Sequence, residues 1–424
     1  MMAEEFQTVV DDIRESLSLN NHKLKRHHFF REKNHFNETT YILSMEWFPE
    51  NSNIATDDYN PEGTAVVDVN FHTKEIKQIL FVNNVNSADH SVYPSSVVKE
   101  DVIDWIEDMT ALTFGRQFLI AQEDEQKLVF RAAVDNIPVS PSGMIRVEFN
   151  ENGLLTLFSI DGEFPTEEQI EWEPFALTPD TYEPVAETQC QLLELPSQEQ
   201  EKWLPVYGME ELFLTNDATR TIPFTFGEDR SSFIPKDEVL RWDAPLEGNF
   251  ERKEIDLSSE VTFETVLANT PHPDTFPLTD EEVEACEREV LSFMRLVYPN
   301  ESGKRSLTGF YLKDGYIKAE IKPVHDAKKA LNLKINLIIE RNTLRAVNYF
   351  DQDNLFEAFK HFAKSDKPIL SSEEAFEKLR GHLDIDPVYV YDSERETYIM
   401  CGKLDCDYGV NAVTGEVLKL NEMF

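Results

Sequence analysis

Residues 398–420 read YIMCGKLDCDYGVNAVTGEVLKL, and this stretch decides the fold class that the chain is expected to adopt. It predicts a strand over its first four residues, a second strand over 407–412, a tight turn and a closing strand over 417–420. Gly415 can take the positive φ that a short hairpin loop with a bulge requires. Because side chains alternate along a strand, one face carries Tyr408, Val410 and Ala412.

A helix that can cover this face is predicted upstream. Ser371 and Glu374 have the spacing of a capping box. The apolar residues that follow recur at helical intervals, at Ala375, Phe376, Leu379 and Leu383. Another strand, 388–391, precedes the hairpin, so the C-terminal part is predicted to be an amphipathic helix laid across a small antiparallel sheet.

The sequences LSSEEA at 370–375 and YGVNAVTGEV at 408–417 together resemble the PepSY domain, the module of peptidase propeptides and of YpeB-type proteins. That family ends in a strand with the pattern Val-Asp-Ala-x-Thr-Gly-Glu-Val, and this chain has Asn411 at the place of the aspartate. The resemblance implies a module that contacts protein, either to inhibit or chaperone a peptidase or to modulate a partner at the cell envelope.

Three sets of residues recur in the same order along the chain: Val98, Ile145 and Asn216 match Val283, Ile335 and Asn411. We therefore predict two copies of one unit, 96–225 and 278–424, each with a helix, a curved antiparallel sheet and a PepSY-like cap. This arrangement resembles the YcdB-type proteins, which are built from repeated PepSY-like units. The other predicted domains are an N-terminal PepSY-like segment, 1–95, and a linker with some local structure, 226–277.

The N-terminal segment repeats the closing turn of the chain. It is predicted to open with an amphipathic helix, 4–18, and its residues 70–76, NFHTKEI, match 411–417 position by position. Lys74 stands where the other copy has glycine, so either Lys74 adopts a left-handed conformation or the turn differs. A helix from Ser96 to about Leu112 is expected to end at Gly115.

Composition limits the partners. Asp and Glu number 80 against 40 Lys and Arg, which gives a formal charge of −40 over 424 residues. Such a field repels nucleic acid and anionic lipid, and it either favours a cationic partner, such as a basic protein or peptide, or serves solubility alone. No apolar run approaches the ~20 residues of a spanning helix, and no secretory leader is recognisable. Together with only four cysteines, this predicts a cytoplasmic protein without membrane insertion.

Two clusters could bind metal. The basic stretch 22–35 holds four histidines and five Lys or Arg residues, and it reads either as a metal or anion site or as a positive face paired with acidic groups of the same chain. His27 and His28 are adjacent and point apart, which favours the second interpretation. Cys401 and Cys406 would lie on opposite faces of one strand, so neither a shared metal nor a disulfide is expected.

The other polar patterns read as surface. The pairs Asp351 and Asp353, and Asp384 and Asp386, have a same-face strand spacing that suits calcium but lack the remaining ligands, so we interpret them as acidic strand edges. The acidic, Pro-rich stretch 162–201 is expected to be a mobile surface. No common catalytic or phosphate-binding motif is present. No catalytic, cofactor-binding or metal-binding residue is therefore predicted.

Tyr389, Tyr391 and Tyr398 gather near the C-terminal hairpin. They read either as cross-strand packing pairs or as a face that binds a protein or peptide. We expect an α+β protein made of duplicated antiparallel sheets with helices on one face. Its predicted function is non-enzymatic binding or regulation, and the PepSY resemblance points to a peptidase inhibitor or modulator. Two alternatives place a hydrolase active site, or a small cationic ligand or metal, in a cleft between the two halves.

Overall fold

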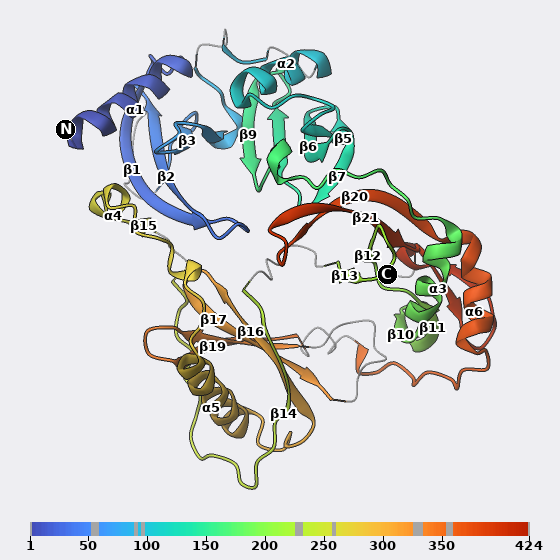
Figure 1. Cartoon of the computed structure of the whole chain (residues 1–424). Coiled ribbons are helices and arrows are strands. Elements are labelled where there is room, and N and C mark those ends of the chain that lie inside the picture. The colour runs from blue at the N-terminus through green and yellow to red at the C-terminus, as the bar shows by residue number, and fades with distance from the viewer. Residues whose placement is uncertain are drawn as a thin grey trace. The chain divides into compact units, whose positions relative to one another are not determined.

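The structure is a computed structural model of the chain (Figure 1). The protein is α+β, with several antiparallel sheets and few helices. Its internal contacts divide it into two compact units: unit 1 is Met1–Trp172, Ser258–Thr275 and Val388–Ile399, and unit 2 is Glu173–Leu257, Phe276–Pro387 and Met400–Phe424. The residues described are 2–51, 59–88, 92–94, 98–224, 232–256, 260–324, 334–352 and 359–422.

The units are defined by contacts, whereas the predicted domains were defined by sequence repeats. Each unit is discontinuous and draws on three stretches of chain. The predicted domain limits at 95, 225 and 277 therefore stay predictions about the repeats.

Unit 1 contains two successions of a helix and a four-stranded antiparallel meander. The first is α1 (Met2–Ser16), β1 (His22–Lys33), β2 (Thr39–Pro49), β3 (Ala65–Asn70) and β4 (Ile76–Phe81). The second is α2 (Lys99–Thr110), β5 (Phe118–Asp124), β6 (Lys127–Val134), β8 (Met144–Phe149) and β9 (Leu155–Asp161), with a short additional strand β7 (Ile137–Ser140). β4 pairs with β9, which joins the two meanders into one sheet in the order β1-β2-β3-β4-β9-β8-β6-β5.

Both helices of unit 1 pack on the same face of this sheet (Figure 1). Direct cross-strand neighbours on that face form an apolar row, Met45, Val67, Ile79, Phe158, Val147 and Leu128. All six are fully buried in one core with Val9 and Ile13 of α1 and Val102 and Ile106 of α2. The opposite face is therefore left to the alternate side chains of every strand.

The end of α2 differs from the prediction. The helix ends at Ala111, whose φ of 58° is left-handed and whose backbone N–H donates to the Glu107 carbonyl. Gly115, the expected end, instead takes a φ of 76° in the next turn, where its N–H donates to the Phe118 carbonyl. Ser96, the predicted first residue, lies outside the described residues.

Unit 2 contains a third succession of the same kind. α5 (Asp280–Val297) is followed by the antiparallel meander β16 (Arg305–Lys313), β17 (Tyr316–Pro323), β18 (Ile335–Glu340) and β19 (Arg345–Asp351). A capping box opens α5, because the Glu282 N–H donates to Thr279 Oγ1 at 3.2 Å and the Thr279 N–H donates to Glu282 Oε2 at 2.8 Å.

The remaining helices and strands of unit 2 exchange partners. One set is α3 (Pro179–Gln189), β10 (Gln191–Ser197), β11 (Lys202–Gly208), β12 (Leu212–Thr215) and β13 (Thr221–Pro223). The other is α6 (Ser372–Leu379), β20 (Asp384–Asp392), β21 (Thr397–Asp405), β22 (Tyr408–Asn411) and β23 (Val417–Lys419). Of this second set, residues 388–392 of β20 and 397–399 of β21 belong to unit 1. β11 pairs with β22, and β12 pairs with β21, so each of these pairings joins one strand from each set.

One core joins the exchanged strands. Ala186 of α3 and Phe376 of α6 are buried in it together with Leu214 of β12, Leu404 of β21 and Val410 of β22. The expected capping box of α6 is present, with the Glu374 N–H donating to Ser371 Oγ at 3.3 Å. α6 covers β22, as predicted, and it also packs on β11 of the other set. The stretch 162–201 was expected to be a mobile surface, and it contains α3 and β10 instead.

The segment 226–277 contributes to both units. β14 (Ile234–Val239) extends the α5 sheet by pairing with β16 in unit 2. β15 (Glu260–Val261) pairs with β1 in unit 1, and α4 (Phe263–Leu267) places Val266 in the unit 1 core. The described part of the predicted linker is thus built into two sheets.

The closing turn occurs twice with the same hydrogen bonds. Asn411 Oδ1 accepts from the backbone N–H groups two and three residues ahead, at 2.9 and 3.1 Å, and its carbonyl accepts from the Gly415 N–H at 2.8 Å. Asn70 does the same at 3.0, 3.2 and 2.8 Å. Gly415 has a φ of 72°, as predicted, and Lys74 takes the left-handed position with a φ of 64°.

The third predicted match is shifted by one residue. The Thr215 N–H donates to the carbonyl five residues ahead, as the Asn411 N–H does, so Thr215 and not Asn216 is the counterpart of Asn411. Asn216 has a different role. Its side chain donates to the Pro174 carbonyl and accepts from the Ala176 N–H, which fixes the chain before α3.

Candidate functional site

The three predicted tyrosines lie in unit 1 and are mainly packing residues. Tyr389 and Tyr398 are 2% and 0% exposed, so their side chains present no surface to a partner. The Tyr398 hydroxyl is 2.9 Å from His35 Nε2, and the Tyr391 ring lies 5.4 Å from the Tyr398 ring. His35 and Phe36 of the β1–β2 turn pack against Tyr391 and Tyr398. A protein-binding face at these three tyrosines stays a prediction.

The basic stretch 22–35 is engaged within the chain. His22 is buried, with Nε2 3.1 Å from the Gly63 carbonyl oxygen, and burial lowers its pKa. Arg26 donates to Glu46 at 2.5 Å, and Arg31 donates to two backbone carbonyls of unit 1. Among the residues that the structure describes, no three His, Cys, Asp or Glu side chains are placed to hold a metal ion. Lys23 and Arg26 pair with glutamates of the same chain, whereas His22 and Arg31 contact backbone carbonyls, so the choice between the two interpretations stays a prediction.

The described members of the predicted cysteine and aspartate pairs lie in or next to β19, β20 and β21. Cys401 lies in β21, Cys406 follows that strand directly, and both thiols are buried. Asp384 begins β20 and is exposed, and Asp351 accepts a hydrogen bond from the Tyr298 hydroxyl at 2.5 Å. Asp353 lies outside the described residues.

A polar row crosses the face of the unit 1 sheet opposite α1 and α2. Register places His28, Ser44, Asp68, Gln78, Ser159 and Arg146 as successive cross-strand neighbours. Ser44 and Ser159 are buried, Asp68 and Gln78 are half-buried, and Arg146 is exposed. We call this face, opposite the helices, the second face. It differs from the helix face because every member of its central row can form hydrogen bonds.

Carboxylates from three strands crowd the second face. Side chains alternate between the two faces along each strand. By this alternation Glu32 of β1, Asp68 of β3 and Asp161 of β9 all lie on the second face. Burial, together with the nearby charges of Asp161 and Asp68, raises the pKa of Glu32, and Lys77 opposes the rise. The Glu32 side chain nevertheless keeps an exposed surface. Burial likewise raises the pKa of Asp68, although the Ser44 hydroxyl and His28 oppose the rise. Three strands thus place carboxylates on this face, and Lys77 is a basic group beside them.

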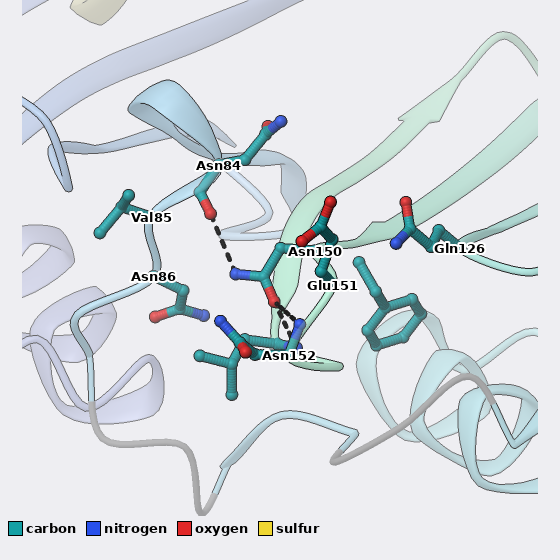
Figure 2. Close-up of a pocket in the computed structure, with 9 residues that line it drawn as sticks. Asn84, Val85, Asn86, Gln126, Asn150, Glu151 and Asn152 are labelled. Carbon is teal, nitrogen blue, oxygen red and sulfur yellow. Dashed lines mark hydrogen bonds between the residues drawn. The ribbon is translucent and has the colours of Figure 1, made fainter.

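A pocket lies at one end of unit 1, between the loop after β4 and the turn between β8 and β9 (Figure 2). Its cavity volume is about 440 Å³. Side-chain amides dominate the lining, and Glu151 is the charged member: Asn84, Val85, Asn86, Gln126, Phe149, Asn150, Glu151, Asn152 and Leu154. We call it the asparagine pocket.

Asn150 holds the two walls of the asparagine pocket together (Figure 2). Its Oδ1 accepts from the backbone N–H groups of Asn152 and Leu154 at 3.0 and 3.1 Å, which shapes the β8–β9 turn. Its Nδ2 donates to the Asn84 carbonyl at 3.0 Å across the pocket. Asn86 adds a second link by donating to the Leu155 carbonyl at 2.8 Å. The walls are therefore fixed by hydrogen bonds before any ligand arrives.

Sequence reasoning missed both the second face and the asparagine pocket. The pocket residues come from two loops, VNNVN at 82–86 and NEN at 150–152, whose asparagine content was a readable signal. Nothing local indicates that these loops meet, because their contact depends on the pairing of β4 with β9. The polar row could not be predicted either, because it also depends on which strands pair.

Comparisons with known proteins add little. No family model matches the sequence, and no curated protein matches it. Among solved structures, the chain is similar to the Bacillus megaterium YpeB C-terminal domain, with 9% sequence identity over 52% of this chain and 97% of that one. The TM-score of 0.28 is too low to support an argument about fold or function. Among the described residues, no helix is both long enough and apolar enough to cross a membrane.

Proposed function

We propose that this chain is a non-enzymatic binding protein that holds a basic protein or peptide on the second face of unit 1. The observation that carries the proposal is the crowding of Glu32, Asp68 and Asp161 on one sheet face. Burial first, and the charges of Asp161 and Asp68 second, raise the pKa of Glu32; a lysine or arginine side chain brought there favours its charged form, so binding and charge neutralisation favour each other. The polar row supplies hydrogen-bonding groups beside those charges.

The net charge of the whole chain also favours a positively charged partner. Its formal charge of −40 attracts cationic molecules over long range and repels phosphate-rich ones. Such steering weakens as salt shortens the Debye length, which is about 10 Å at 0.1 M ionic strength. A basic partner is therefore expected to associate faster at low salt.

The test begins with capture of partners by the full chain at low ionic strength, followed by surface plasmon resonance of the recovered partner between about 0.05 and 0.5 M salt. We expect the association rate to fall steeply over this range. Glu32→Gln combined with Asp161→Asn should slow association several-fold at low salt. Glu251→Gln combined with Glu254→Gln removes the same charge from exposed positions of unit 2 and serves as the control.

Two results would refute this function. A partner whose association rate is flat across the salt range would not be held by the carboxylates. Equal loss in the two double variants would mean that net charge, rather than the second face, governs association. A parallel screen with esterase, peptidase and phosphatase substrates addresses the hydrolase alternative, since turnover abolished by one point substitution would make the protein an enzyme.

A further inference from the structure

We propose that the asparagine pocket binds an uncharged carbohydrate, as a site separate from the second face. The chemistry of its lining carries this inference. A primary amide donates and accepts hydrogen bonds at once, and a sugar hydroxyl does the same, so amides and hydroxyls complement each other in either orientation. Gln126 and Asn152 present exposed side-chain amides at the pocket, and Asn84 adds a third exposed amide.

The charges at the pocket select against other ligands. Among the described residues that line the pocket there is no lysine or arginine, whereas recognition of a phosphate or carboxylate relies on such cations. Glu151 is the charged lining residue, and it repels anions further. Val85 and Leu154 provide apolar contact for the C–H groups of a sugar ring. The volume of about 440 Å³ lies in the range of small-molecule sites and suits one or two sugar rings.

The backbone of the pocket is held in an uncommon conformation. Asn83 and Asn84 follow one another with φ values of 60° and 59°, in the left-handed region that non-glycine residues seldom occupy. Asparagine tolerates this region better than most residues, and the Asn150 side chain secures it by binding the Asn84 carbonyl. Fixed walls reduce the ordering that a ligand must impose, which favours binding of small polar molecules.

The test uses the full chain and an array of neutral mono- and oligosaccharides, followed by calorimetric titration of those that bind. The saccharide concentration should reach about 10 mM, so that binding with a dissociation constant near 1 mM approaches saturation. We expect at least one neutral saccharide to bind, with an affinity that does not change with salt. Gln126→Leu combined with Asn152→Leu should weaken that binding about tenfold or more, since both substitutions remove ligand hydrogen bonds and keep the side-chain bulk.

The matched control is Gln191→Leu combined with Gln198→Leu, which removes two exposed amides from unit 2 and should leave the affinity unchanged. Thermal unfolding of each variant checks that it is folded. The inference is overturned if no neutral saccharide titrates, or if the pocket variant binds as tightly as the parent chain. Capture of the basic partner should be the same in the pocket variant, so failure of this inference is distinguishable from failure of the second-face proposal.

Discussion

Val206 of β11 and Asn411 of β22 are direct antiparallel neighbours, although they belong to different sets of strands. The reciprocal pair is Leu214 of β12 with Gly402 of β21. Each set therefore provides strands that complete a sheet of the other, in the manner of a domain swap within one chain. The set that begins with α3 and the set that begins with α6 should consequently fold and unfold together.

Substitution in one set should loosen the other. Val410 of β22 is fully buried, and Val410→Ala should destabilise the shared core by about 1–3 kcal/mol through lost contacts and a small cavity. We expect faster amide exchange in β10 and β11, measured by hydrogen–deuterium exchange mass spectrometry. Val347→Ala in β19 removes the same group from the α5 sheet and should leave β10 and β11 protected. Unchanged amide exchange in β10 and β11 of the Val410→Ala variant would mean that the two sets fold independently.

The closing turn predicts that two substitutions of Gly415 differ in their effect on stability. Gly415→Val should destabilise unit 2 by roughly 1–2 kcal/mol or more, because a β-branched side chain is poorly tolerated at positive φ. Gly415→Lys should be milder, since Lys74 already occupies the equivalent position at a φ of 64°. Urea unfolding of both variants measures the difference. Equal stability of the parent chain and Gly415→Val would contradict the turn.

The four thiols should be inert in the folded protein. Cys190, Cys286, Cys401 and Cys406 are all reduced and buried. Burial, and to a smaller extent the repulsion of nearby glutamates, raises the pKa of Cys286 to about 12. Burial also raises the pKa of Cys190 and of Cys406. Because the thiolate is the reactive form, we expect labelling by a thiol reagent at pH 8 only after denaturation. Rapid modification of any one cysteine in the native chain would contradict this arrangement.

The crowded carboxylates predict a pH-dependent stability. An acid whose pKa is raised on folding binds more protons in the native state, so its contribution to stability falls as pH rises above its ordinary value of 3.8. Asp68→Asn should therefore stabilise unit 1 at pH 7 by roughly 0.5–1 kcal/mol, the size of a single polar effect. The gain should shrink as the pH is lowered toward 4.

Urea unfolding of the parent chain and the variant at pH 7 and at pH 4.5 checks this dependence. Asp104→Asn on the exposed side of α2 is the control, and it should change stability by less than about 0.5 kcal/mol at either pH. A destabilised Asp68→Asn variant at pH 7 would show that the Asp68 carboxylate is needed for hydrogen bonding with Ser44 and Gln78 more than it is disfavoured by its neighbours.

The sequence by itself determined the local structure. The capping boxes at Thr279 and Ser371, the left-handed position of Gly415 and the alternation of the β22 strand were all readable, because each depends on residues within a few positions of one another. The beginning of α3 was readable in principle too. Thr178 precedes Pro179 there, as at many helix starts, but the prolines and glutamates around them suggested a mobile chain instead.

Only the tertiary structure decided which strands pair and which loops meet. The edges of small antiparallel sheets are chemically alike, so β11 could pair with β12 or with β22 without any local difference in sequence. The choice depends on burial of the whole shared core, which no short stretch encodes. The same holds for the asparagine pocket, since Asn84 and Asn150 meet because β4 and β9 are neighbours in the sheet.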